Sequence, residues 1–323
     1  MVGDNGFIRI TISANFKWQP GQHCFLRFRS FGIDSLSSHP FTICSLPSTS
    51  PQKASETVFY IRRRGGFTAK LHNHATTHPG VQIPVFVDGP YGGIDNQKFF
   101  DSDRLIVVAG GSGGGWVLPF VELFLRHLSS TVHQDHVAEE VQQSIQSPSE
   151  PTQPQAQRGP RSLRVILATR DIATRTWFHT ALDNLLSDYK SLGTAPDLTV
   201  EVHLTGEAEH VAQPPTKGAS DLERSGSSSQ EEASATKGKE NQEKFARDDI
   251  PEEEALGRPD LPVMIREEAA VAASTGQTVG VFVCGPLEMQ NDVRNAVAKE
   301  NLSILKNPRS GGIYLHLEHF SWA

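Results

Sequence analysis

Residues 103–128 read DRLIVVAGGSGGGWVLPFVELFLRHL, which joins an apolar strand-like run, a glycine-rich turn and an amphipathic helical pattern. A turn of this kind at the carboxyl end of a strand lets backbone amides and the helix dipole receive a phosphate group. The turn AGGSGGGW is not a full GxGxxG, because Trp116 stands where the last glycine would be. From the residues alone, phosphate binding and a purely structural turn are equally supported.

Apolar strand-like runs that alternate with helical patterns recur further along the chain. They include SLRVILATR, DLTVEVHLTG and TVGVFVCGPLEMQNDVRNAVAKE. Alternation of this kind predicts a parallel sheet with helices on its faces. We therefore expect an α/β parallel-sheet domain over residues 101–323.

Two polar segments interrupt this domain, at residues 129–160 and 207–262. Both are poor in aromatic residues and rich in Ser, Gln, Glu or Lys, which predicts low-complexity, disordered insertions. Residues 217–260 hold 12 acidic and 7 basic side chains. Most of the chain's net charge of −7 is therefore predicted to lie in the second insertion, with a nearly neutral folded part.

The first part of the chain, residues 1–100, is β-rich. FIRITISA alternates apolar and polar residues, and PGQHCFLRFRS, HPFTICSLPS, TVFYIRRRGG and VQIPVFVDGPYGG are further short strand-like runs bounded by turns. Short strands at this spacing predict a small antiparallel β-barrel.

Bulk properties exclude several classes of function. A net charge of −7 and a pI near 6.0 argue against nucleic acid as a partner. The three cysteines are too few and too widely spaced for a disulfide framework or a zinc site, which indicates a reducing compartment. No signal-peptide layout and no apolar run of about 18 residues occurs, so the chain as given is expected to be soluble.

Two strand ends carry candidate functional side chains. Cys284, Gly285 and Pro286 follow a buried strand-like run and precede a helix, at the sheet edge where α/β proteins bind ligands. Arg170 closes the run VILATR, where a guanidinium suits the 2′-phosphate of NADP. The alternative readings are a buried apolar cysteine and an arginine exposed by chance.

A histidine-rich stretch, LHNHATTH, contains His72, His74 and His78. The spacing does not match a zinc pattern, so we predict a surface loop and no metal site.

Six motifs, in order and spacing, resemble those of the ferredoxin reductase-like flavoproteins. They are PGQHCFLRF, HPFTICS, IRRRGGFT, GPYGG, GGSGGGWVLPF and CGPLEMQNDVRNAV. The resemblance is strongest to the cytosolic portion of fungal ferric reductases, which are related to the NADPH oxidases, and covers residues 7–128, 161–206 and 277–322. It implies an FAD-binding β-barrel followed by an NADPH-binding α/β domain. The family's first barrel strand would precede Gly3, so this chain is expected to lack it.

The resemblance also implies roles for residues of the barrel. In HPFT, His39 would contact the FAD diphosphate, Phe41 would lie against the flavin or its ribityl chain, and Thr42 would hydrogen-bond the ring edge near N5 as a catalytic group. Pro40 is also expected among the cofactor-binding residues. In IRRRGGFT, the residues expected at the diphosphate are Arg62, Gly66 and Thr68.

In the α/β domain, the resemblance implies that the glycine turn holds the NADPH diphosphate and that Arg170 binds its 2′-phosphate. Cys284 and Gly285 would border the nicotinamide, with Cys284 as a catalytic residue, and Pro286 is expected among the cofactor-binding residues. Trp322 would be the terminal aromatic residue that covers the flavin. The residues expected in the glycine turn are Gly111, Ser112 and Gly113.

The implied activity is NADPH-dependent ferric-chelate reduction, with electrons passing from NADPH through FAD to haem and then to ferric iron. The haem would belong to a membrane domain that this chain lacks, which places the chain at the cytosolic face of a membrane if it is part of a longer protein. The alternatives are an NADPH oxidase-like module, a soluble flavin reductase and an inactive truncated remnant.

Overall fold

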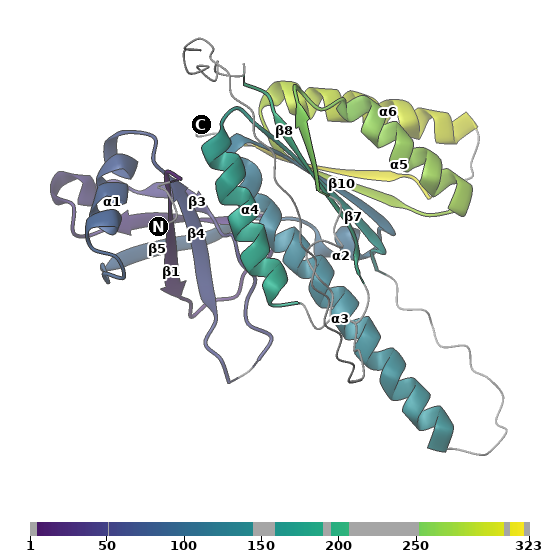
Figure 1. Ribbon diagram of the computed structural model, residues 1–323, viewed down its shortest axis with the longest axis horizontal. Helices are drawn as coiled ribbons and strands as arrows, with labels where there is room; N and C mark the ends of the chain where they lie inside the picture. The colour runs from purple at the N-terminus through teal and green to yellow at the C-terminus, as the bar shows by residue number, and fades with distance from the viewer. Residues whose placement is uncertain are drawn as a thin grey trace, which may run out of the picture.

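The structure, a computed structural model, describes residues 5–50, 52–144, 159–189, 195–206, 252–306 and 311–319. It contains an antiparallel β unit in the N-terminal part and an α/β domain in the C-terminal part (Figure 1). Within the described residues no helix is both long and apolar enough to cross a membrane.

The β unit consists of two antiparallel sheets around one apolar core. One sheet has two strands and the other has three. Among the described residues no strand pairing joins the two sheets into a closed barrel. The predicted antiparallel strands are confirmed. They are β1 (Phe7–Ser13) with β4 (Glu56–Arg62), and β3 (His39–Thr42), β2 (Gln22–Phe28) and β5 (Val85–Gly92) in that spatial order.

The prediction of a surface loop at the histidine-rich stretch is wrong, because helix α1 (Gly66–Thr77) includes most of it. Phe67 and Leu71 lie four residues apart and are both buried, so they place one face of this helix on the core of the β unit. His72 is buried as well, while His74 and His78 stack on each other. Among the described residues no three His, Cys, Asp or Glu side chains are placed to hold a metal ion.

The α/β domain is built on a six-stranded parallel sheet, as the alternating pattern predicted. Most positions of its central strands are buried on both faces. In spatial order the strands are β11 (Ile313–His319), β10 (Val279–Gly285), β6 (Arg104–Gly110), β7 (Ser162–Thr169), β8 (Asp197–Leu204) and β9 (Glu252–Leu256).

Helices cover both faces of this sheet (Figure 1). One apolar core contains residues of α3 and α4 and the other contains residues of α5 and α6. The bounds are α2 Asn96–Phe100, α3 Gly114–Ser144, α4 Ile172–Ser187, α5 Leu261–Thr275 and α6 Leu287–Lys306.

Both predicted insertions are partly structured. Helix α3 continues to Ser144, so disorder over 129–160 is wrong for the first half of that segment, which has no proline or glycine before Pro148. Strand β9 and the start of α5 likewise lie inside the predicted insertion at 207–262. The remaining parts, 145–158 and 207–251, lie outside the described residues.

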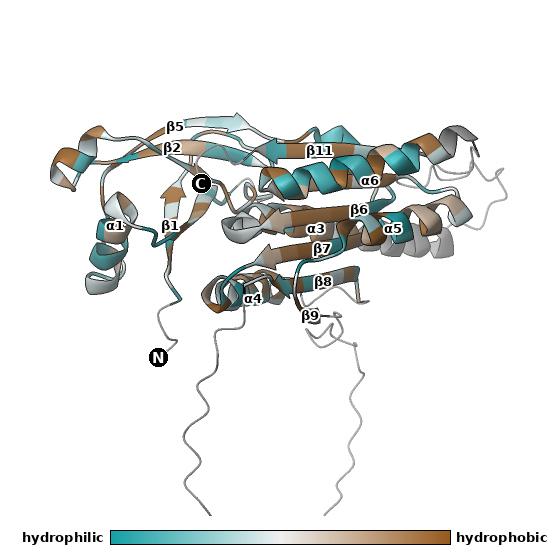
Figure 2. Ribbon diagram, turned by 90° about the horizontal axis from the view of Figure 1, so that it is seen from above, coloured by the Kyte–Doolittle hydropathy of each residue, from teal (hydrophilic) through white to brown (hydrophobic). Residues whose placement is uncertain are grey.

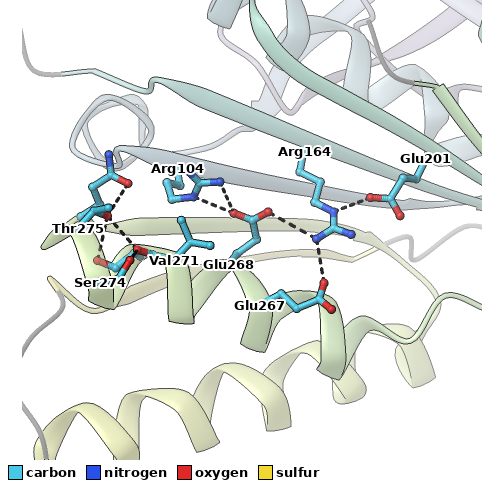
Figure 3. Close-up of polar contacts among 10 residues, drawn as sticks. Arg104, Arg164, Glu201, Glu267, Glu268, Val271, Ser274 and Thr275 are labelled. Carbon is cyan, nitrogen blue, oxygen red and sulfur yellow. Dashed lines mark hydrogen bonds and ion pairs between the residues drawn. The ribbon is translucent and has the colours of Figure 1, made fainter.

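A network of charged side chains lies between the sheet and α5 (Figure 3). Arg164 of β7 donates to Glu201 of β8 at 2.5 Å and lies 3.5 Å from Glu268 and 3.6 Å from Glu267 of α5. Arg104 of β6 pairs with the same Glu268 at 2.8 Å. Glu201 is only 4% exposed, so this network satisfies a charge that water does not reach.

The β unit and the α/β domain share one core. Phe7 of β1 stacks on Trp177 of α4 with ring centroids 4.2 Å apart, and Cys44 is buried in the cluster formed by α3 and α4. Glu122 of α3 accepts a hydrogen bond from the backbone of Leu46 at 3.1 Å. Contacts of this kind fix the two parts relative to each other.

Candidate active site between the two domains

Strand β3 carries the HPFT residues at the edge of the three-stranded sheet. His39 stacks on Phe67 of α1 with ring centroids 4.4 Å apart and an interplanar angle of 3°. Its Nε2 atom is buried and has no hydrogen-bond partner among the described residues. A buried polar nitrogen that lacks a protein partner can form a hydrogen bond with a bound ligand. Pro40, Phe41 and Thr42 follow in the strand, all half-buried.

Burial lowers the pKa of His39 below its ordinary value, and the nearby Asp34 only partly opposes this. The imidazole is therefore neutral at pH 7, with one N–H donor. It can donate a hydrogen bond to a phosphate oxygen without adding positive charge.

Arg62 ends strand β4, next to the turn that begins α1. Its Nη2 lies 3.0 Å from Oδ2 of Asp171, and its guanidinium lies over the ring of Phe7 at 5.9 Å. One ion pair leaves other N–H groups of a guanidinium for a second acceptor. Arg62 is thus held in place from the α/β side.

The turn before α1 is organised by Thr68. Its hydroxyl accepts hydrogen bonds from the backbone amides of Arg64 and Gly65 and donates to the Gly65 carbonyl at 3.0 Å. Gly66 has a φ of +50°, and a Cβ there would meet none of the described atoms within 4 Å. The Thr68 side chain therefore shapes this turn, and its surface is open for a ligand to approach.

The glycine turn follows β6 and opens helix α3. Gly111 has a φ of +56°, which favours glycine, and a Cβ there would meet open space. Ser112 is half-buried and Gly113 is buried at the start of the helix. The turn thus leaves open space next to the backbone of Gly111, close to a helix N-terminus.

The glycine turn and the CGP loop touch each other. A Cβ on Gly110 would come within 2.7 Å of Cδ of Pro286, and one on Gly285 would lie 3.4 Å from the Gly110 amide nitrogen. The cause is the register of the sheet, which pairs Cys284 with Ala109. The two predicted nucleotide-binding loops are therefore in contact with each other.

Strand β11 connects this surface to the β unit. Glu318 pairs in register with Cys284, and a Cβ on Gly92 would lie 3.8 Å from Glu318 Oε1 and 3.5 Å from His23 Nδ1. His23 is in turn the register partner of Thr42. In Figure 2, β11 lies end to end with β2 and β5. The ends of β3 and β10 are thus brought to the same region.

Arg170 is the first residue after β7, which neighbours β6 in the sheet. Its side chain is exposed, and its carbonyl oxygen lies against Gly206, where a Cβ would come within 2.3 Å. Gly110 pairs with Ala168, so Arg170 extends past the sheet edge that carries the glycine turn. Trp322 lies outside the described residues.

All three cysteines are buried, and burial is the main reason that their thiol pKa values rise. The pKa of Cys24 rises to about 11 and that of Cys44 to about 12, while Cys284, which also faces the charge of Glu318, rises well above its ordinary value. Cys284 is therefore a protonated thiol at pH 7 and not a nucleophilic thiolate.

We expect iodoacetamide at pH 8 to leave all three cysteines of the native chain unmodified, because each thiol stays protonated and buried. Urea-unfolded chain under the same conditions serves as the control and should be modified at Cys24, Cys44 and Cys284. Mass spectrometry of the intact chain reads out both states. Rapid modification of one thiol in the native chain would contradict the assignment.

The residues that sequence reasoning missed are Asp171, His23 and Glu318. Asp171 begins α4 as its N-cap, accepting from the Thr174 amide at 2.8 Å, and only the D-x-x-T pattern was visible in the sequence. Its ion pair with Arg62 joins positions 109 residues apart along the chain. Nothing local in the sequence predicts that contact.

Comparisons with known proteins find matches to both parts of the chain. A model of an FAD-binding domain matches residues 4–95, and a model of the ferric reductase NAD binding domain matches residues 102–298. Solved structures include the CS-b5R domains of human Ncb5or in the NAD+ form, with a TM-score of 0.50 and 15% identity over 97% of this chain and 65% of that one. This likeness supports the two-domain fold.

Curated relatives are ferric reductases by name. The "Probable cell surface ferric reductase kap2" of Aspergillus oryzae is 29% identical over 63% of this chain and 24% of its own length. "Ferric reduction oxidase 2" of Arabidopsis thaliana is 31% identical over 40% of this chain and 17% of its own length, and "Ferric reductase transmembrane component 6" of Saccharomyces cerevisiae is 30% identical over 34% and 15%. The chain spans about a quarter or less of these relatives.

The match to the NAD-binding model covers more than half of the chain, and the FAD-binding model covers most of what precedes it. The chain therefore belongs to the ferric reductase family, and it carries the FAD-binding and NAD-binding portion of such a flavin-dependent NAD(P)H oxidoreductase.

Proposed function

We propose that this chain takes electrons from NADPH and passes them through FAD to haem in a membrane domain of a longer protein, for the reduction of ferric chelates. The names of the relatives and their greater length support the acceptor and the membrane partner. On this proposal the chain works at the cytosolic face of the membrane.

One observation carries the proposal. The ends of β3 and β10, which bear Thr42 and Cys284, meet through Glu318, Gly92 and His23 at the junction of the two parts. A flavin ring held by the first strand and a nicotinamide held by the second would occupy the same junction. That proximity is what transfer of a hydride requires.

The β unit offers a fitting site for FAD. The unpartnered Nε2 of His39, the Arg62 guanidinium and the open turn at Gly66 lie on adjoining elements around Phe67 and could share a diphosphate. The Thr42 hydroxyl would orient the ring edge. Bound FAD supplies the conversion between a two-electron donor and one-electron acceptors.

Several residues of the α/β domain support the proposed binding of NADPH. The backbone of residues 111–113 at the start of α3 would hold the diphosphate, and Arg170 would bind the 2′-phosphate at the neighbouring strand end. Pro286 is exposed beside the glycine turn, where it and Gly285 would border the nicotinamide. The protonated Cys284 thiol would keep that wall uncharged.

The decisive experiment mixes the purified chain, loaded with FAD, with NADPH in the absence of oxygen. We expect the visible absorbance of the oxidised flavin to bleach, because the chain itself brings the two rings together. Free FAD at the same concentration is the control. A loaded chain whose flavin absorbance stays unchanged would contradict the proposed electron path.

Replacing Arg170 with alanine should raise the KM for NADPH by about 10- to 100-fold, as expected for the loss of a charge-assisted hydrogen bond of about 1.5–3 kcal/mol. The KM for NADH should stay nearly constant, because NADH lacks the 2′-phosphate. Arg161→Ala, at an exposed arginine just before β7, is the matched control. Equal changes for both nucleotides would remove Arg170 from the 2′-phosphate site.

A further inference from the structure

Two large apolar side chains stand out on the surface of the β unit. Ile33 is 81% exposed and Leu36 is 78% exposed, and both belong to the short 3-10 helix η1 (Gly32–Leu36). Residues three apart in such a helix lie on the same side. The pair therefore forms one apolar tip, at the end of the β unit far from the α/β domain (Figure 1).

This tip is anchored. Phe31, just before it, lies against Phe28 and Phe67 with centroids 6.4 and 5.5 Å away. Asp34, between the two exposed residues, pairs with Lys70 of α1 at 2.5 Å. The Phe31 side chain packs against the β unit while Ile33 and Leu36 are exposed to solvent. The fold therefore holds these two side chains at the surface.

Two exposed arginines lie close to η1 along the chain. Arg29 directly follows β2 and lies over the exposed ring of Phe86 at 5.4 Å, and Arg27 pairs in register with that same Phe86. Residues 1–100 hold ten Lys and Arg against five Asp and Glu, whereas the whole chain carries −7. The β unit therefore carries a net positive charge, and the rest of the chain carries a net negative charge.

We propose that the surface formed by Arg27, Arg29, Ile33, Leu36 and Phe86, here called the η1 surface, docks on anionic phospholipid. The apolar tip would enter the headgroup region while the arginines pair with phosphate and carboxylate groups. Charge complementarity selects this occupant, because a second copy of the chain would bring the same positive surface. The negative α/β domain, at the other end of the molecule, would point away from the lipid.

This inference goes beyond the proposed electron path, and its test uses no redox reaction. The FAD-loaded chain is sedimented with phosphatidylcholine vesicles, with and without phosphatidylserine. We expect binding only to the anionic vesicles, and we expect added salt to weaken it, because exposed charges are screened over about 10 Å at 0.1 M salt.

Replacing Ile33 and Leu36 together with aspartate should reduce the partition constant by about tenfold or more, since two apolar contacts are lost. Replacing Arg27 and Arg29 with alanine should cost about fivefold for each residue. The matched control is Leu302→Asp, which changes a 60% exposed leucine on α6 of the α/β domain and should leave binding unchanged. None of these positions is buried, so the variants should fold.

Three outcomes would overturn the proposal. The first is absence of binding to anionic vesicles, and the second is binding that the η1 variants leave intact. The third is a chain dimer, seen by analytical ultracentrifugation, that the Ile33→Asp/Leu36→Asp variant dissociates, because the η1 surface would then be a contact between copies. Flavin bleaching by NADPH should persist in every variant, which separates this inference from the proposed function.

Discussion

Replacing Arg164 with methionine should lower the free energy of unfolding by about 3–5 kcal/mol. Arg164 contacts Glu201, Glu267 and Glu268, and Glu201 is almost fully buried. Removing the guanidinium leaves a buried carboxylate without its main partner, and that loss outweighs the apolar gain of the methionine. Urea denaturation followed by circular dichroism measures the change.

The control for this variant is Arg258→Met. Arg258 pairs with Glu288 at 3.8 Å, but both side chains are more than three-quarters exposed, so the expected change is within about 0.5 kcal/mol. A double variant, Arg164→Met with Glu201→Met, should recover much of the lost stability, because it removes the buried carboxylate together with its partner, while Glu268 keeps Arg104 and Glu267 is exposed. Equal effects of the two arginine variants would show that the network of Arg164 contributes little.

The same network makes stability depend on pH. Burial would raise the pKa of Glu201, but the neighbouring His203 and Arg164 outweigh burial and hold that pKa below its ordinary value of 4.5. The ionised form is thus favoured in the folded state, and its contribution to stability is present above pH 4.5 and lost as the pH falls through the lower folded pKa. The urea midpoint of Glu201→Gln should therefore vary less with pH below 4.5 than that of the unchanged chain.

Replacing His39 and Arg62 together with alanine should weaken FAD binding by about 100-fold or more, which corresponds to two polar contacts with a charged diphosphate. His39 contributes a buried nitrogen with no protein partner, and Arg62 contributes a guanidinium held by Asp171. Flavin fluorescence titration gives the dissociation constant. Circular dichroism shows whether the variant keeps its fold.

Arg63→Ala is the matched control, because Arg63 is the exposed neighbour of Arg62. Its effect on the dissociation constant should stay within about threefold, as for a screened surface charge. Asp171→Asn should fall between the two, because the carboxylate only positions Arg62. Full FAD affinity in the double variant would move the diphosphate away from β3 and α1.

Most of the α/β domain could be predicted from the sequence because its central strands are recognisable from local apolar runs, whereas β9 (EEEAL) has no such run and was missed. VGVFVCG and RLIVVAG are apolar runs that end in a turn, and parallel strands place such turns on one edge. That edge carries the glycine turn, Arg170 and Cys284, as expected. The contact between Gly110 and Pro286 then follows from register alone.

Helical structure inside polar or histidine-rich segments could not be predicted in the same way. The helix from Gly66 to Thr77 has a weakly apolar pattern, and its stability comes from Phe67 and Leu71 packing on strands elsewhere in the chain. The contacts of Arg62 with Asp171 and of Phe7 with Trp177 depend on how the two parts meet. The two partners of each pair are far apart along the chain, so no local sequence pattern predicts their contact.

The shared core has a consequence for protein engineering. Phe7, Cys44 and Tyr60 of the β unit lie against Trp177 and the first turns of α3 and α4, so the seam is a continuous interior and not a hinge. In a chimera whose α/β domain came from a relative, these side chains would pack against residues that differ from their present partners. Altered coenzyme preference is better sought by grafting the strand-end loops alone.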